Sequence, residues 1–154
     1  MNAEKMIKIR RDGQIITEEM SVADIAALGW PPEEVVRLEW LCAGEKKAIE
    51  NPFGIIARYL PDRSGIAVLH YEDASNVTRR LDVWDADGSL RFSRDAHLLL
   101  DGVMLHGYYG WFEPSRSGST NVLGVIFSPD ADRSMFHLDL DTHSGEVVGV
   151  FRAR

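Results

Sequence analysis

The sequence predicts an α+β domain: an N-terminal hairpin and two short helices, followed by a strongly curved antiparallel β-meander that forms a partial barrel or a sandwich. Helix-start signals gather within the first 50 residues. From Gly54 onward, apolar segments of about five to eight residues alternate with turn signals. The connections between these segments are too short for the crossovers that parallel strands require. We therefore expect antiparallel pairing in the second part of the chain.

The length of 154 residues suits one domain. We expect a single domain over 1–154, with a helical lobe and hairpin over 1–50 joined to an antiparallel β-meander over 51–154. A chain of this size buries enough surface to fold without a metal or a disulfide. Its one cysteine, Cys42, cannot form an internal disulfide.

The N-terminal segment carries a hairpin signal followed by a helix signal. The Asp-Gly pair at 12–13 separates two apolar segments, 6–9 and 14–17, which predicts a hairpin. Ser21 then begins a helix, because Asp24 stands three residues later and completes a weak capping box. Gly29 is expected to end that helix.

A second helix is expected over 33–43. Two prolines at 31–32 and two glutamates at 33–34 are typical of a helix start, and Gly44 suits the C-terminal cap. A strand remains an alternative, because apolar residues also alternate along this segment, namely Val36, Leu38, Trp40 and Cys42.

The β-meander is expected to contain eight strands. They are 55–60, 66–71, 77–84, 89–93, 107–113, 122–128, 135–142 and 146–152. A polar loop over 72–76 separates the second of these from the third, and the structure of 97–104 stays open between strand and loop. Three of these strands, beginning at 107, 122 and 146, are apolar on both faces, so each must be covered twice. We expect the N-terminal lobe to provide the outer cover, with another protein chain as the alternative.

The strand over 135–143 has two distinct faces. One carries Phe136, Leu138 and Leu140; the other carries His137, Asp139, Asp141 and His143. Histidine and carboxylate can bind zinc. However, alternate side chains on a strand stand about 6.5–7 Å apart, so at most two of the four reach one ion. We therefore expect no metal and no cofactor, and we find no catalytic motif that would indicate an enzyme.

The net charge of −7 limits the kinds of partner. It disfavours nucleic acid and would speed the encounter with a basic protein. No apolar run approaches the roughly 20 residues that cross a bilayer, so no membrane partner is expected. With no signal peptide evident at the N-terminus, the cytoplasm is the expected location.

These features favour a non-enzymatic protein-binding module, in one version an acidic immunity or inhibitor protein that neutralises a bacterial toxin. The expected partner-binding residues are Tyr108, Tyr109, Trp111, Asp139 and Asp141. Two alternatives remain. The first is a small-ligand-binding protein or enzyme of β-barrel type, with a pocket lined by His106 and the same aromatic residues. The second is a structural homo-oligomer, such as a homodimer, that covers its own two-sided strands.

Overall fold

The computed structural model describes residues 1–29, 34–73 and 77–153. Among these residues, strands make up 58% and a single helix makes up 3%. All strand pairs are antiparallel. The protein is therefore nearly all antiparallel sheet, and the prediction of an α+β fold with two helices is wrong.

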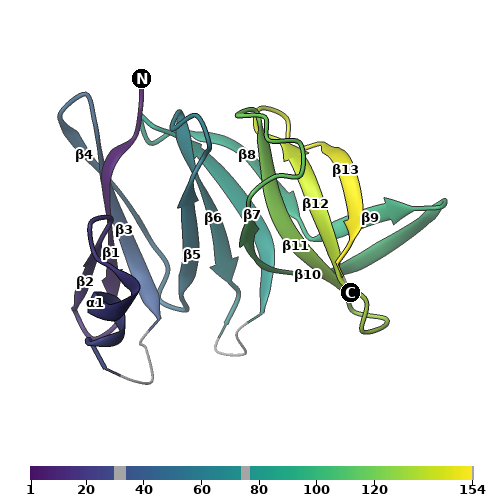
Figure 1. Cartoon of the computed structure of the whole chain (residues 1–154), viewed down its shortest axis with the longest axis horizontal. Coiled ribbons are helices and arrows are strands. Elements are labelled where there is room, and N and C mark those ends of the chain that lie inside the picture. Colours follow the sequence, from purple (N-terminus) through teal and green to yellow (C-terminus); the bar gives the residue numbers. More distant parts are fainter. Residues whose placement is uncertain (30–33, 74–76, 154) are drawn as a thin grey trace.

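The N-terminal sheet has four strands in the order β2-β1-β3-β4 (Figure 1). The strands are β1 (Glu4–Arg10), β2 (Ile15–Thr17), β3 (Val35–Cys42) and β4 (Glu45–Glu50). The predicted hairpin is confirmed as β1 and β2. The first predicted helix is confirmed as α1 (Val22–Ala26), which is shorter than expected and is capped by the reciprocal bonds between Ser21 and Asp24.

The second predicted helix is instead β3, a central strand of this sheet. Leu38, Trp40 and Cys42 are buried in alternation, which a strand achieves and a helix does not. Gly44 does not cap a helix; it forms with Ala43 a tight turn in which both residues have positive φ, as a type I′ hairpin requires. The start signals at 30–33 lie outside the described residues, as does 74–76 in the predicted loop over 72–76.

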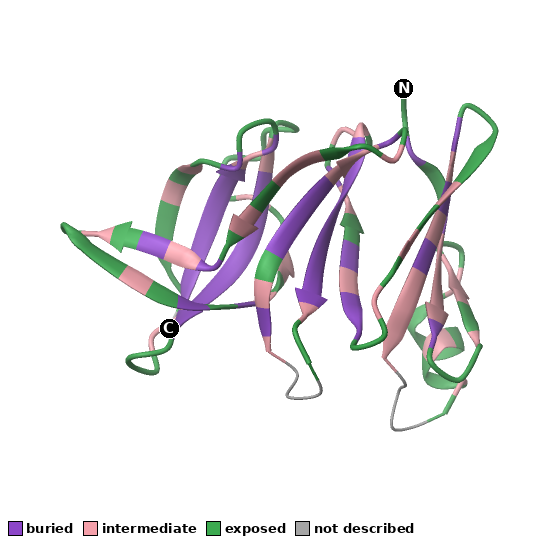
Figure 2. Cartoon of the chain, turned by 180° about the vertical axis from the view of Figure 1, so that it is seen from behind, coloured by how far each residue is buried: buried purple, intermediate pink, exposed green. Residues whose placement is uncertain are grey.

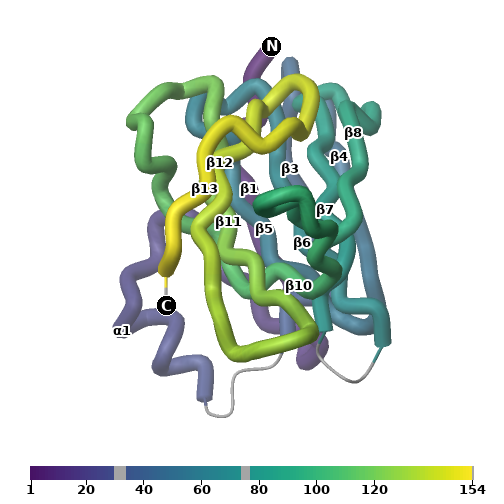
Figure 3. Tube along the Cα trace, turned by 90° about the vertical axis from the view of Figure 1, so that its right-hand side faces the viewer, coloured from purple at the N-terminus to yellow at the C-terminus, as the bar shows by residue number. Residues whose placement is uncertain are grey.

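The second sheet has nine strands and curls into a half-barrel (Figures 1 and 3). Its main order is β13-β12-β11-β10-β7-β6-β5, while β8 pairs with β7 and β9 with β10. The strands are β5 (Ile55–Tyr59), β6 (Gly65–Tyr71), β7 (Thr78–Asp85), β8 (Leu90–Asp95), β9 (His97–Leu100), β10 (Val103–Glu113), β11 (Val122–Pro129), β12 (Phe136–Asp141) and β13 (Val147–Arg152).

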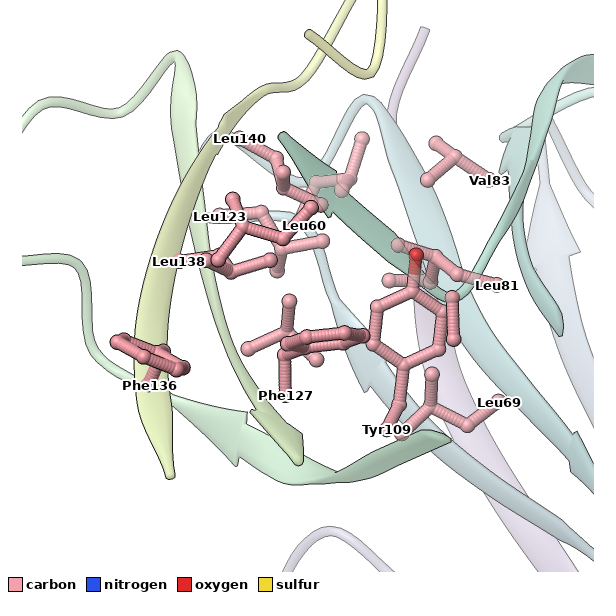
Figure 4. Packing of buried hydrophobic residues seen from close by; sticks show 14 residues of the cluster. Leu60, Leu69, Leu81, Val83, Tyr109, Leu123, Phe127, Phe136, Leu138 and Leu140 are labelled. Carbon is pink, nitrogen blue, oxygen red and sulfur yellow. The ribbon is translucent and has the colours of Figure 1, made fainter. Parts of the chain in front are cut away.

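Two hydrophobic cores lie on opposite sides of β6. Figure 2 shows that most of this strand is buried. Ile66 and Val68 pack against the N-terminal sheet, while Ala67 and Leu69 point into the half-barrel. The half-barrel core is filled by large side chains such as Tyr109 and Phe127, which meet edge to face (Figure 4). The N-terminal lobe therefore covers β5 and β6, and the expectation that it covers the strands of the final third is wrong.

Trp40 joins the two sheets, and its replacement tests their packing. Its ring is buried between them, and its Nε1 donates a hydrogen bond of 2.8 Å to the carbonyl oxygen of Ala86. We expect Trp40→Phe to lower the free energy of unfolding by about 1–3 kcal/mol, because that buried carbonyl loses its donor. Urea unfolding followed by circular dichroism measures the change.

Trp111→Phe is the matched control, since the Trp111 ring is exposed. We expect it to change the free energy of unfolding by about 0.5 kcal/mol or less. An equal loss in the two variants would contradict the role assigned to Trp40.

Candidate functional site

A hairpin formed by β9 and the first part of β10 projects from the half-barrel (Figure 1). Asp101 and Gly102 form its tip, a tight turn with positive φ at both residues. Leu99, Val103 and Met104 are exposed on it, Leu99 to 62%. We call residues 97–106 the arm. These three side chains face solvent, whereas Leu98 on the other face of the arm is buried in the half-barrel core.

The base of the arm is held by Tyr109 and Arg94. The Tyr109 ring is 1% exposed, and its hydroxyl donates to the carbonyl oxygen of Asp95 at 3.0 Å. The Arg94 guanidinium donates to that hydroxyl and, at 2.8 Å, to the carbonyl oxygen of His97. Burial raises the pKa of the Tyr109 hydroxyl to about 12, so it stays protonated and remains a donor. Tyr109 thus positions the arm from inside the core.

A groove of about 600 Å³ lies between the arm and β13. One wall is formed by the arm, including Leu99 and Met104, and the other by Val147 and Val150 of β13. Polar groups also line it, among them Glu146. The groove therefore presents apolar side chains from two separate elements to whatever enters it, an arrangement typical of sites that accept a partner's side chain.

The opposite, convex face of β10–β13 carries a row of register partners. Ile126, His137 and Phe151 are paired across β11, β12 and β13, and the irregular segment of β10 that contains Trp111 lies opposite Ile126. Ile126 and His137 are buried, whereas Trp111 and Phe151 are exposed at the two ends of the row. The Phe151 ring meets the His137 ring edge to face, with centroids 5.9 Å apart.

His137 is the centre of a buried polar network beneath that row. Its Nε2 lies 2.6 Å from Oδ1 of Asp139, and its Nδ1 lies 3.4 Å from Oε2 of Glu113. Asp139 also accepts the backbone N–H of Arg116 at 3.1 Å. The hydrogen bond from the Trp111 indole, helped by His137, holds the pKa of the Glu113 carboxyl below its usual value. These bonds connect β10, β12 and the loop that follows β10.

The five sequence-predicted partner residues are not brought together. Tyr108 and Trp111 are exposed on β10, whereas Tyr109 lies in the core and Asp139 is 3% exposed. Asp141 accepts backbone N–H groups of the turn after β12, and these bonds lower the pKa of its carboxyl. A role of these five residues in partner binding stays a prediction. Their positions leave Tyr108 and Trp111 as the two with rings accessible from solvent.

The groove was missed by the sequence reasoning, although part of it carries a signal. The Asp-Gly pair at 101–102 is the same hairpin signal as the one at 12–13, and it stands between two apolar segments. It identifies the arm within the stretch 97–104, whose structure had stayed open. Nothing in the sequence indicates that the arm lies beside β13, because that neighbourhood follows from the curl of the sheet.

Other kinds of site receive no support from the described part of the chain. Within it, no group of three or more His, Cys, Asp or Glu side chains is placed to hold a metal ion. Its single helix is too short to cross a membrane, so no candidate span of that kind is present among those residues.

The comparisons with known proteins include a match to a solved structure. No family model matches the sequence, and the search of the curated proteins finds no match. A chain in the solved structure described as "Structure of Tne2 in complex with Tni2" is 31% identical to this one, with a TM-score of 0.91. The match covers 99% of each chain.

The fold and the surface define an all-antiparallel β protein with a curled half-barrel and apolar side chains left exposed on its last strands. The full-length match then identifies the family. This chain belongs to the same family as the matched protein of the Tne2–Tni2 complex. That relative is one of two different proteins that form a complex.

Gly124 makes room for the His137 network, and substitution there tests how tightly it is packed. A Cβ at Gly124 would lie 2.8 Å from Cε1 of His137 and would also meet the carbonyl oxygen of Glu113. We expect Gly124→Ala to lower the free energy of unfolding by about 1–3 kcal/mol through overpacking. Urea unfolding of the purified chain measures the change.

Gly110→Ala is the control, since a Cβ there would lie at an ordinary distance of 3.6 Å from Cγ2 of Ile126. We expect it to remain within about 0.5 kcal/mol of the parent protein. A network that tolerates both substitutions equally would show that His137 has space to move.

Proposed function

We propose that this chain is an immunity-type protein that binds a toxin and neutralises it. The full-length match to a protein of the Tne2–Tni2 complex carries the proposal. We infer that Tne2 and Tni2 are a toxin and its immunity protein, and that this chain corresponds to the immunity member. The absence of a catalytic motif from the sequence and its net charge of −7 support that assignment.

The charge suggests the chemistry of the partner. A molecule with 24 acidic and 17 basic side chains attracts a basic surface from a distance and speeds the encounter. Long-range attraction selects the partner, while buried apolar contacts supply most of the affinity. We therefore propose a basic toxin surface that approaches through charge and is held through apolar side chains.

The alternative of a ligand inside a β-barrel has less support. Large buried side chains of β6, β7 and β10–β12 fill the interior of the half-barrel, including Leu69, Tyr109 and Phe127. They occupy the space that an enclosed ligand would need.

Co-expression tests the proposed function. Tne2 and, separately, the protein encoded directly beside this chain's gene are produced in a bacterium with and without the full chain. We expect the chain to restore colony counts to those of an empty-vector strain for at least one of the two. We also expect that protein and this chain to elute as one complex in size-exclusion chromatography. Growth inhibition without rescue, together with separate elution of both proteins, would overturn the proposal.

Light scattering separates this function from the homo-oligomer. An immunity protein that reserves its apolar surface for a toxin is expected to remain monomeric across a dilution series and to gain mass only when the toxin is added. A mass that doubles as the concentration of the chain alone rises would favour the structural homodimer.

A further inference from the structure

Two strand edges in this protein lack the features that usually prevent edge-to-edge pairing. Edge strands are normally protected by charged residues or by being very short. Most edges among the described strands have such protection. β2 has only three residues, β5 carries Arg58 and β8 carries three charged residues. β4 carries four charged residues, namely Glu45, Lys46, Lys47 and Glu50. In contrast, β9 contains no Lys, Arg, Asp or Glu, and β13 has a single charge at its last residue, Arg152.

Both unprotected edges border the same groove. β9, as part of the arm, forms one wall of the groove, and β13 forms the opposite wall. In Figures 1 and 3 the arm crosses near β13 at a steep angle instead of running alongside it, so the two edges do not pair with each other. Among the described strands, β13 is hydrogen-bonded to β12 alone, so one row of its backbone N–H and C=O groups has no partner in them.

The side chains of β13 show where an added strand would place its own. Val150 is paired with Leu138, which belongs to the half-barrel core, and Val150 itself lines the groove. Register partners on neighbouring strands point to the same face of a sheet. Alternate side chains of a strand added beyond β13 would therefore point into the groove, toward Leu99 and Met104 of the arm.

We propose that an extended segment of the partner protein adds as a further strand along β13, over 149–152, and places apolar side chains in the groove under the arm. This inference rests on the proposed function and names the surface and the binding mode. An extended segment is favoured over a helix because only a strand satisfies the free backbone groups of β13. The register irregularity lies at Val148, before this segment, so the pairing of 149–152 with β12 is regular.

The residues of the added segment follow from the groove. Leucine, methionine and valine side chains line both walls of the groove, together with Arg94, His97 and Glu146. We therefore expect aliphatic residues at alternate positions of the partner segment, with the intervening side chains on the convex side near Phe151. The arm then acts as a clamp that buries those aliphatic side chains between itself and β13.

Amide hydrogen exchange of the complex tests the backbone part of the proposal. The full chain is compared alone and bound to whichever protein, Tne2 or the neighbouring gene product, forms a complex with it. We expect the amides of 149–152 to exchange more slowly in the complex, because half of them gain a hydrogen-bond acceptor. The amides of β4, a protected edge on the far sheet, are expected to be unchanged. Unchanged exchange in β13 within a formed complex would overturn the added strand.

Substitution in the arm tests the side-chain part. We expect the double variant Leu99→Glu/Met104→Glu to raise the dissociation constant by about tenfold or more, since it places charges against a buried apolar contact. Leu90→Glu is the matched control: Leu90 is 50% exposed on β8, outside the groove. It should bind as the parent does. Circular dichroism confirms that each variant is folded.

The outcomes separate the two proposals. If the parent chain binds neither protein, the proposed function fails. If the parent binds, and Trp111→Ala abolishes binding while the arm variant leaves it intact, the function stands and the convex face replaces the groove as the binding surface.

Discussion

Burial of the middle strands on both faces is the constraint on which the architecture depends. β6 places Ile66 and Val68 against the N-terminal sheet and Ala67 and Leu69 inside the half-barrel. A strand that is apolar on both sides must be covered twice, and one small sheet cannot cover the whole of a nine-stranded one. The N-terminal sheet is thus committed to β5 and β6, and the far strands must curl to build the second core by themselves.

That commitment explains why apolar surface remains exposed at the other end. The curl brings the inward side chains of β10–β12 together around Tyr109 and Phe127, but it does not close, because β13 has no further strand beside it. The arm extends from β10 past this opening. Exposed aliphatic residues of the arm and of β13 consequently meet at one groove, even though they are far apart in the sequence.

The sequence predicts local features, such as turns and helix caps, better than it predicts which elements pack against one another. The hairpin at 12–13 and the cap at Ser21 depend on a few adjacent residues, and both were predicted correctly. The segment 35–42 satisfied both a helical and a strand pattern, and pairing with β1 and β4 decided between them. His137 and Asp139 lie on the polar face of β12, yet they are buried, because Phe151 and the loop after β10 cover them. Which element covers a strand face is a tertiary property that alternation along one strand does not contain.

The negative charge and the unprotected edge have complementary consequences. An open edge beside an apolar groove is an aggregation hazard, since it can pair with another copy of itself. Two copies each with a net charge of −7 repel one another, and this repulsion disfavours pairing between identical chains. The same net charge would attract a basic partner of the kind we propose. The net negative charge therefore favours the proposed pairing of β13 with a basic partner over pairing with a second copy of this chain.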